Sequence, residues 1–405
     1  MSMDTEEMLL AQPMDAVVLI GGCDKTVPAQ LMGAASARLL SIELITGSTL
    51  TGSHRSERVG ACTDCRCYWG KFRAEEIDGD KVADVNDQLV ASVGTCSVVG
   101  TASTMACIAE ALGMTVPGGA SPPAVTADQM RVAERTGAQA VQIAKQRPTI
   151  DQILTPDAFY NAMRVLLAIG GSTNRIIHLT AIAVVAVSID LDALDRMGRE
   201  TLVLVDLKPS GQHCMKDFHH AGGMATLFRE LRPLLKFDVV SVTGMTLGEE
   251  IALSPRSFEQ EVIRPFDRPV FAQGGIAVLK GNLAPRGAVI KQSAANAMLM
   301  EHVGRAVVFE NPEDMANRID SEELDVNADD ILVLKNIGPR GAPGMPEAGY
   351  IPIPKKLAGA GVRDIVRISD GRMSGTLSGR LFCTSRPERL LVGPLRTYAQ
   401  ATGFN

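Results

Sequence analysis

Three adjacent residues, Cys23, Asp24 and Lys25, place a thiol, a carboxylate and an amine on one turn. A thiolate is a soft ligand that selects iron–sulfur clusters, zinc or copper, whereas a carboxylate is a hard ligand that selects magnesium, calcium or manganese. Their adjacency therefore indicates two different metals at one substrate site. A buried cysteine beside a solvated Asp–Lys pair is the alternative interpretation of the triplet taken alone.

The other cysteines do not form a complete zinc pattern. The chain has eight cysteines, which in an intracellular protein of this size are thiols or ligands more often than disulfides. Cys62, Cys65 and Cys67 resemble one half of a zinc knuckle, but no second pair with matching spacing follows. Cys96 lies in a glycine-rich turn at residues 94–101, where a small buried residue is the alternative interpretation.

Three further loops could present polar groups to a ligand. Gly170–Asn174 offers backbone amides and the side chains of Ser172, Thr173 and Asn174 at a helix start, which suits an anionic substrate group. Plain helix capping explains this segment equally well. Residues 338–347 and 369–376 are rich in glycine, and the first of them would deliver the carboxylate of Glu347. For either loop alone, an ordinary surface turn is the alternative.

Short apolar runs alternate with helical patterns through the first half of the chain. Strands are predicted at Ala16–Ile20 and Leu89–Val93, and helices at Pro28–Leu39, Thr104–Leu112 and Phe159–Ile169. This alternation predicts a layered α/β domain over residues 1–257, with glycine-rich loops at strand ends, where ligands usually bind.

The pattern changes after Phe258. Short β-branched segments separated by Gly, Pro and Asn predict a β-rich, barrel-like domain over residues 258–376. The predicted strands are Gly275–Lys280, Ala288–Lys291, Ala306–Phe309, Ile331–Lys335 and Ile365–Ile368.

Charge and hydropathy exclude several classes of partner. The net charge is −6 and no basic stripe with interleaved aromatic residues is present, which argues against nucleic acid and anionic membranes. The longest apolar stretches, such as Ala181–Val187, are too short to span a bilayer. Acidic residues near the N-terminus do not fit a signal peptide, so a cytoplasmic location is predicted.

Together these segments resemble the dihydroxy-acid and sugar-acid dehydratase family, which includes phosphogluconate dehydratase. The resemblance runs from about Met1 to Thr376, with the motifs in the family's order. The segments GGCDKTVPAQLMGAASA (21–37) and SDGRMSGT (369–376) are most similar to pentonate dehydratases of the arabinonate and xylonate type, and to hexonate dehydratases.

The resemblance implies a cofactor for each kind of ligand. Cys23 and Cys96 would bind an iron–sulfur cluster, [2Fe–2S] in preference to [4Fe–4S]. Asp24 and Glu347 would bind magnesium. Lys25 would bind it too, as a carbamate, because an ammonium group has no lone pair to offer a metal.

The resemblance also implies the reaction. Ser374 would be the base, with Thr376 beside it at the substrate, and the segment Ser172–Asn174 would bind the substrate. Dehydration of a 2,3-dihydroxy acid requires loss of the C2 proton and departure of hydroxide from C3. Metal ions assist both steps, and the product would be a 2-keto-3-deoxy acid. The dihydroxy-acid dehydratase of branched-chain amino-acid biosynthesis is one alternative, and an inactive truncated pseudogene product is another.

Two departures from the family are expected. Family members carry about a hundred further residues upstream, a domain-sized piece that supplies a third cluster cysteine and another acidic magnesium ligand. Leu377–Asn405 is predicted to be an out-of-frame tail. Weak cluster retention and doubtful activity are therefore expected, while intact relatives assemble as dimers or tetramers.

Overall fold

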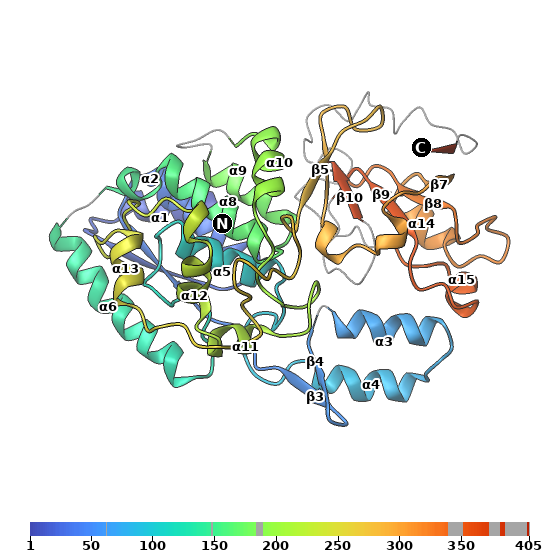
Figure 1. The fold of residues 1–405 in the computed structure, drawn as a ribbon, viewed down its shortest axis with the longest axis horizontal. Helices are drawn as coiled ribbons and strands as arrows, with labels where there is room; N and C mark the ends of the chain where they lie inside the picture. Colours follow the sequence, from blue (N-terminus) through green and yellow to red (C-terminus); the bar gives the residue numbers. More distant parts are fainter. Residues whose placement is uncertain are drawn as a thin grey trace. The chain divides into compact units, whose positions relative to one another are not determined.

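The computed structural model describes residues 1–61, 63–146, 149–183, 189–338, 351–371, 381–384 and 403–404. The chain forms two compact units, which are seen in Figure 1. The first unit contains Met1–Ser53 and Val90–Gly275, and the second contains His54–Leu89 and Ile276–Asn405. Nothing in the sequence pattern indicated that residues 54–89 group with the C-terminal half.

Helices dominate the first unit. Its described elements are α1 (Ser2–Ala11), β1 (Val17–Gly21), α2 (Thr26–Ala37), β2 (Ser41–Ile45), α5 (Thr101–Ala111), α6 (Ala127–Gln146), α7 (Ile150–Ile153), α8 (Pro156–Ala168), α9 (Asn174–Ala183), α10 (Leu191–Glu200), α11 (Met215–His220), α12 (Gly223–Glu230), the 3-10 helix η1 (Arg232–Leu234) and α13 (Leu247–Leu253). The first predicted strand and all three predicted helices are confirmed, as β1, α2, α5 and α8.

Local sequence explains where several of these helices begin. At α8, the hydroxyl of Thr155 accepts a hydrogen bond from the backbone N–H of Ala158 at 3.3 Å, and Pro156 occupies the first turn, where its missing N–H costs nothing. At α13, Thr246 and Glu249 form a reciprocal capping box. Such caps fix helix ends without help from distant residues.

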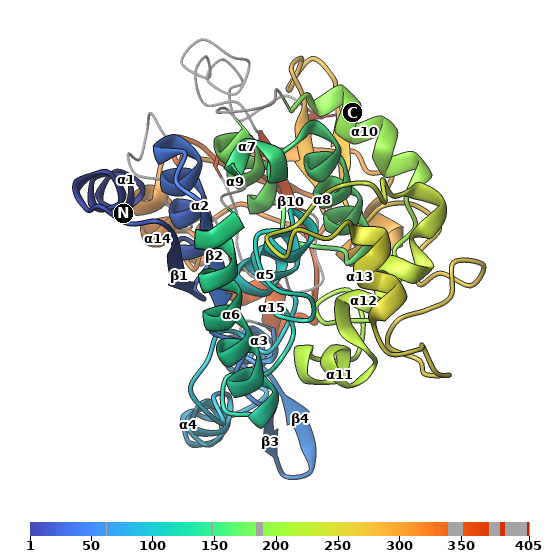
Figure 2. The ribbon, with the colours of Figure 1, turned by 90° about the vertical axis from the view of Figure 1, so that its left-hand side faces the viewer.

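Within the described residues, the sheet of the first unit consists of β1 and β2. They run parallel, with Leu19 opposite Glu43 and Gly21 opposite Ile45. A parallel pair needs a crossover connection, and α2 provides it. Both α2 and α6 pack on this pair of strands (Figure 2). The loops that follow the two strands therefore leave from the same edge.

The strand predicted at Leu89–Val93 is wrong. Helix α4 (Gly79–Gln88) ends just before it, and Val90 and Val93 are 61% and 74% exposed. Pairing begins only at Thr95, through an isolated parallel bridge to Ser48. A short apolar run acquires strand structure only where a neighbouring strand can pair with it, which the pattern alone does not reveal.

The second unit combines a pair of neighbouring helices and a small two-stranded sheet with a larger mixed sheet. The strand β3 (Gly52–His54) crosses the boundary between the two units. The other described elements of the second unit are β4 (Glu57–Val59), α3 (Asp64–Arg73), α4, β5 (Ala277–Leu279), β6 (Ala288–Ile290), the 3-10 helices η2 (Gln292–Ala294) and η3 (Ala297–Leu299), β7 (Gly304–Phe309), α14 (Pro312–Arg318), β8 (Ile331–Leu334), α15 (Lys355–Gly359), β9 (Val366–Ser369), β10 (Leu381–Thr384) and β11 (Gly403–Phe404). All five strands predicted in this half are confirmed.

The mixed α/β class is also confirmed, but the described strands do not close into a barrel. The sheet order is β11-β7-β8-β9-β10-β6-β5, in which β7 to β10 are parallel neighbours and the outer pairs are antiparallel. Helix α14 connects β7 to β8. Parallel strands with crossover helices favour an open sheet covered by helices, which is the reason the barrel-like prediction fails here.

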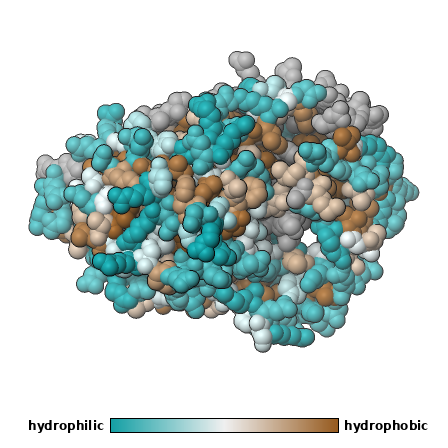
Figure 3. All heavy atoms as spheres, viewed as in Figure 1, coloured by the Kyte–Doolittle hydropathy of each residue, from teal (hydrophilic) through white to brown (hydrophobic). Residues whose placement is uncertain are grey.

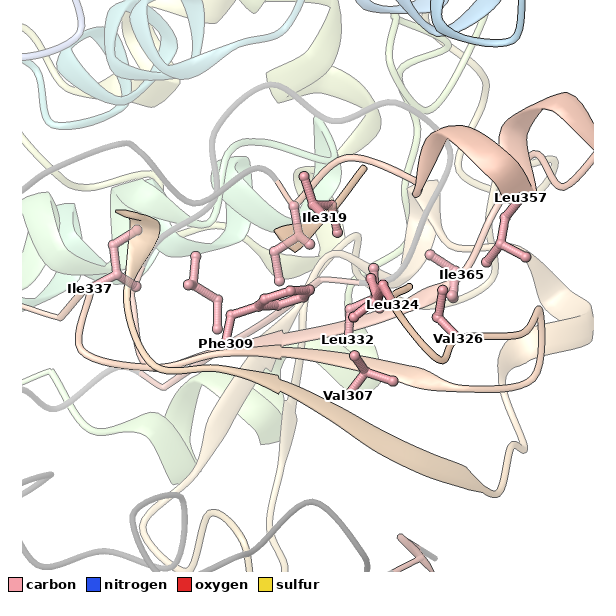
Figure 4. Close-up of a cluster of buried hydrophobic side chains, with 11 residues drawn as sticks. Val307, Phe309, Ile319, Leu324, Val326, Leu332, Ile337, Leu357 and Ile365 are labelled. Atoms are coloured by element: carbon pink, nitrogen blue, oxygen red, sulfur yellow. The ribbon is translucent and has the colours of Figure 1, made fainter. Parts of the chain in front are cut away.

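Buried apolar clusters cover both faces of this sheet, and Val308 and Val333 belong to one of them. The other cluster is shown in Figure 4, with Phe309 and Leu332 among its side chains, both fully buried. Partly buried Met315 of α14 packs against the cluster. Alternate residues of β7 and β8 contribute to it, as expected for a strand whose successive side chains point to opposite faces.

No helix among the described residues is long and apolar enough to cross a bilayer. On the face drawn in Figure 3, hydrophilic side chains predominate and apolar ones are interspersed among them.

Replacing Leu332 by alanine is expected to destabilise the second unit by about 2–5 kcal/mol, because it removes a fully buried side chain and leaves a cavity. Denaturant unfolding followed by fluorescence of Trp69, the single tryptophan, reports on this unit. Leu279→Ala is the control, since Leu279 is 37% exposed on β5 and its loss should cost far less. Equal losses for both variants would contradict the assignment of the core.

Candidate functional site

The loop after β1 brings the first three predicted ligands within reach of one another. Lys25 Nζ donates a hydrogen bond to Asp24 Oδ2 at 3.0 Å, and Cys23 Sγ lies 3.5 Å from Asp24 Oδ1. Cys23 is exposed, whereas Asp24 and Lys25 are partly buried. A thiol, a carboxylate and an amine thus share the turn between the end of β1 and the start of α2.

Cys96 lies on a loop that pairs with the segment following β2. The backbone N–H of Thr95 donates to Gly47 O at 3.0 Å, and Thr49 N–H donates to Thr95 O at 2.7 Å. A Cβ at Gly22 would overlap Thr46 and lie 3.2 Å from Thr95 Cγ2. The residues that precede Cys23 and Cys96 therefore pack together, and both cysteines belong to the same edge of the first unit.

This close approach depends on a second glycine. Gly94 has φ of +134°, a conformation that L-residues rarely adopt. A Cβ at this position would lie 2.4–2.7 Å from backbone atoms of Ser48 and Thr49. Backbone atoms cannot rotate away as a side chain can, so Gly94 fixes the path of the chain into Cys96.

The loop Gly170–Asn174 joins the same region through the start of α5. Thr101 Oγ1 and Ser172 Oγ are 3.1 Å apart, and Asn174 Nδ2 donates to Thr101 Oγ1 at 3.3 Å. Ser172 N–H donates to Thr104 Oγ1 at 3.2 Å. The predicted substrate-binding residues therefore sit beside the helix that begins shortly after Cys96, and Thr173 lies between the two hydrogen-bonded members.

Arg175 ties this loop to the metal-ligand turn. Its side chain is fully buried at the start of α9, and Nη1 donates to the backbone oxygen of Asp24 at 3.2 Å. Neither Arg175 nor Thr101 was predicted from the sequence as a site residue. An arginine directly after a glycine-rich loop and within an apolar helical run is the signal that could have found the first of them.

Burial determines the protonation of nearby groups on α5. It raises the pKa of the Glu110 carboxyl to about 7, although the backbone N–H groups of Gly118 and Ala120 donate to it. Burial likewise raises the pKa of the Cys107 thiol.

The second unit contains another converging edge, at the carboxyl ends of β8 and β9. The carboxylate of Asp370 accepts hydrogen bonds from the backbone N–H groups of Asn336 and Ile337 at 3.1 and 3.0 Å. A Cβ at Gly371 would lie 2.4 Å from Ile337 Cγ2. These two strand ends lead into the segments that carry the remaining predicted residues.

Those remaining residues, Glu347, Ser374 and Thr376, lie outside the described residues, as does most of the predicted tail at 377–405. The segments that carry these residues follow β8 and β9 in the sequence, and these two strands are parallel neighbours in the sheet. In open α/β sheets, ligands bind at the carboxyl ends of strands.

The donor set of the first unit fits the implied cofactors in part. Cys23 and Cys96 supply two soft donors, and Asp24 and Lys25 supply a carboxylate and an amine that could become a carbamate. Across the described ranges, no group of three or more His, Cys, Asp or Glu side chains is placed to hold a metal ion. The implied iron–sulfur cluster usually takes four protein ligands, and the described residues place two thiols at this edge.

Comparisons with known proteins match almost the whole chain. Residues 1–250 match the model of the dihydroxy-acid/6-phosphogluconate dehydratase N-terminal region, and residues 261–400 match that of the C-terminal region. The chain is 46% identical over 398 residues to L-arabonate dehydratase of Azospirillum brasilense, covering 97% of this chain and 68% of that protein.

Other relatives differ in the acid named. The chain is 42% identical to 6-deoxy-6-sulfo-D-gluconate dehydratase of Pseudomonas putida, over 98% of this chain and 69% of the relative. It is 39% identical to dihydroxy-acid dehydratase of Methanothrix thermoacetophila, over 96% of this chain and 70% of the relative. All of these relatives are dehydratases, and the chain spans about two thirds of each.

Replacing Gly94 by alanine is expected to cost about 2–4 kcal/mol in stability, because the substitution adds a Cβ overlap with fixed backbone to an unfavourable φ. Gly118→Ala is the matched control. Gly118 also has a positive φ, but no atom lies within 4 Å of its Cβ position, so only the backbone cost of about 1 kcal/mol should appear. Thermal unfolding of both variants measures the difference, and indistinguishable losses would show that the close approach is unimportant.

Proposed function

Because this chain belongs to the dihydroxy-acid/6-phosphogluconate dehydratase family, a family of hydro-lyases, we propose that it removes water from a pentonate and forms the 2-keto-3-deoxy acid. One observation carries the proposal. Three loops that the sequence singled out, carrying Cys23, Cys96 and Ser172, are joined in the first unit by hydrogen bonds and backbone contact.

Each ligand type has a proposed cofactor. Cys23 and Cys96 would hold an iron–sulfur cluster, proposed as [2Fe–2S], and Asp24, Lys25 as its carbamate, and Glu347 would hold Mg²⁺. When bound, these groups supply Lewis acidity toward the departing hydroxyl and the substrate carboxylate. The buried guanidinium of Arg175 donates to the backbone oxygen of Asp24 and would orient the turn that carries this residue.

The remaining residues would bind the acid and move its proton. Ser172, Thr173 and Asn174 offer hydroxyl and amide groups next to the start of α5, where a substrate carboxylate can accept hydrogen bonds. The Oγ of Ser374 would take the proton from C2, with Thr376 beside it. A serine is a weak base unless nearby cations favour its alkoxide, and the proposed metals are such cations. Loss of hydroxide from C3 then leaves an enol, which tautomerises to the keto acid.

Further parts of the proposal come from the sequence and from the relatives. A cytoplasmic homo-oligomer acting on a small-molecule acid, without nucleic acid or membrane, is proposed. We also propose that one domain ends at residue 257 and the next begins at residue 258, a boundary that falls between the two matched family regions.

The substrate can be tested by measuring 2-keto acid formation from L-arabinonate and from 2,3-dihydroxy-isovalerate, using protein purified without oxygen and supplied with iron, sulfide and Mg²⁺. L-Arabinonate is expected to be converted with a kcat/KM at least tenfold higher, since two relatives named for this acid are 43–46% identical to the chain. The opposite preference would favour the dihydroxy-acid dehydratase alternative. If neither acid is converted, the alternative of an inactive truncated pseudogene product is favoured.

The cluster ligands can be tested separately from activity. Cys23→Ser and Cys96→Ser are each expected to lower bound iron and labile sulfide at least tenfold, because each removes a thiolate ligand. Cys67→Ser is the control, since Cys67 lies on α3 in the second unit and is not a proposed ligand. Iron retained in both site variants, or lost equally in the control, would refute the assignment.

A further inference from the structure

Glu43 has a buried carboxyl group that makes no hydrogen bond among the described residues. It lies on β2 with 0% exposure, and neither of its carboxyl oxygens has a hydrogen-bond partner within the described part of the chain. Burial raises its pKa well above the usual value of a glutamate. A buried polar group without partners is costly, so such a group calls for an explanation.

The sheet register places this carboxyl beside the turn that carries the proposed ligands. Because side chains alternate along a strand, Leu19, Gly21, Glu43 and Ile45 share one face of the β1–β2 pair. A Cβ at Gly21 would lie 2.5 Å from Glu43 Oε1 and still closer to Oε1 of Gln30 on α2. The two oxygens therefore approach the same point over Gly21, two residues before Cys23.

The orientation of the Gln30 amide places its oxygen, and not its nitrogen, on the side of Glu43. Gln30 Nε2 donates to the backbone oxygen of Ile20 at 3.1 Å, which turns Oε1 toward Gly21, and Oε1 has no partner among the described residues. Exchanging the amide nitrogen and oxygen would set Oε1 against the oxygen of Ile20 instead. Two buried acceptors on the same side of Gly21 repel each other unless a proton lies between them.

No charged group on the covering elements replaces that proton. β1 and α2 carry no titratable side chain. Helix α6, which also packs on the two strands, carries Asp128, Arg131, Glu134, Arg135 and Lys145, but none of these is a cause of the raised pKa of Glu43, which follows from burial.

We propose that Glu43 is a neutral carboxylic acid that donates a hydrogen bond to Gln30 Oε1, and that this bond positions the turn between β1 and α2. Gln30 already holds Ile20, and α2 begins at Thr26, directly after Lys25. The Glu43–Gln30 bond thus fixes both ends of the turn that holds Cys23, Asp24 and Lys25. Glu43 is a positioning residue, and its role at the ligand turn rests on the proposed function.

The protonation state is tested with the full chain and without cofactor. Infrared difference spectra between wild type and Glu43→Gln are expected to show the carbonyl band of a neutral carboxylic acid at pH 7.

Stability is expected to fall as the pH rises from the ordinary glutamate pKa to the raised pKa of Glu43, since the unfolded state releases this proton first. In that window the folded-to-unfolded ratio of wild type should fall about tenfold per pH unit relative to Glu43→Gln. An ionised carboxylate band or parallel pH profiles would overturn the proposal. Glu134→Gln, at an exposed position on α6, is the charge control.

Positioning is tested by hydrogen exchange of the backbone amides in residues 19–30. Glu43→Gln keeps a donor and should leave exchange unchanged, whereas Glu43→Leu should accelerate it at least tenfold. Equal exchange in all three proteins would refute the positioning role. Because neither measurement uses a cluster or a substrate, a protein that binds no cluster would disprove the proposed function and leave the Glu43–Gln30 bond standing. If Glu43→Leu does not fold, Glu43→Gln and the infrared spectra still decide the matter.

Discussion

The parallel pairing of β1 with β2 is the constraint on which the first unit depends. Parallel strands joined by a helix end at the same edge, so the turn that holds Cys23 and the loop that receives Thr95 must be neighbours. The approach is close enough that side chains at Gly22 and Gly94 would not fit. The arrangement of the proposed site therefore requires glycine at both positions, since a side chain at either one would overlap its neighbours.

The second unit also has a parallel strand pair with neighbouring ends, but there a side-chain carboxylate, and not close backbone packing, connects the two ends. The ends of β8 and β9 are held together by one carboxylate, Asp370, which accepts two backbone N–H groups. A charged acceptor of this kind is stronger than a neutral one, and it ties Asp370 to Asn336 and Ile337 just beyond the two strand ends. In each unit, a parallel strand pair delivers chemistry-bearing loops to one edge, and short-range contacts then fix how those loops leave it.

Much of the fold follows from local pattern. The strands of the second unit were predicted because β-branched runs between glycine and proline have few other structures open to them. The strand at Leu89–Val93 was wrong because its pattern is equally compatible with a loop, and no partner strand was available. The grouping of residues 54–89 with the C-terminal half could not be predicted, since it depends on contacts between segments far apart in the chain.

The sequence by itself determined the family, the adjacency of a thiol, a carboxylate and an amine at Cys23, Asp24 and Lys25, and several of the helices and strands, because these depend on residue type and short spacing. Only the tertiary structure decided that Arg175 reaches the backbone of Asp24 and that Glu43 meets Gln30 over Gly21. Such contacts depend on which face of a strand or helix turns inward, and on burial that makes an unpaired charge costly. Neither can be read from the order of residues, since both arise only when distant segments pack together.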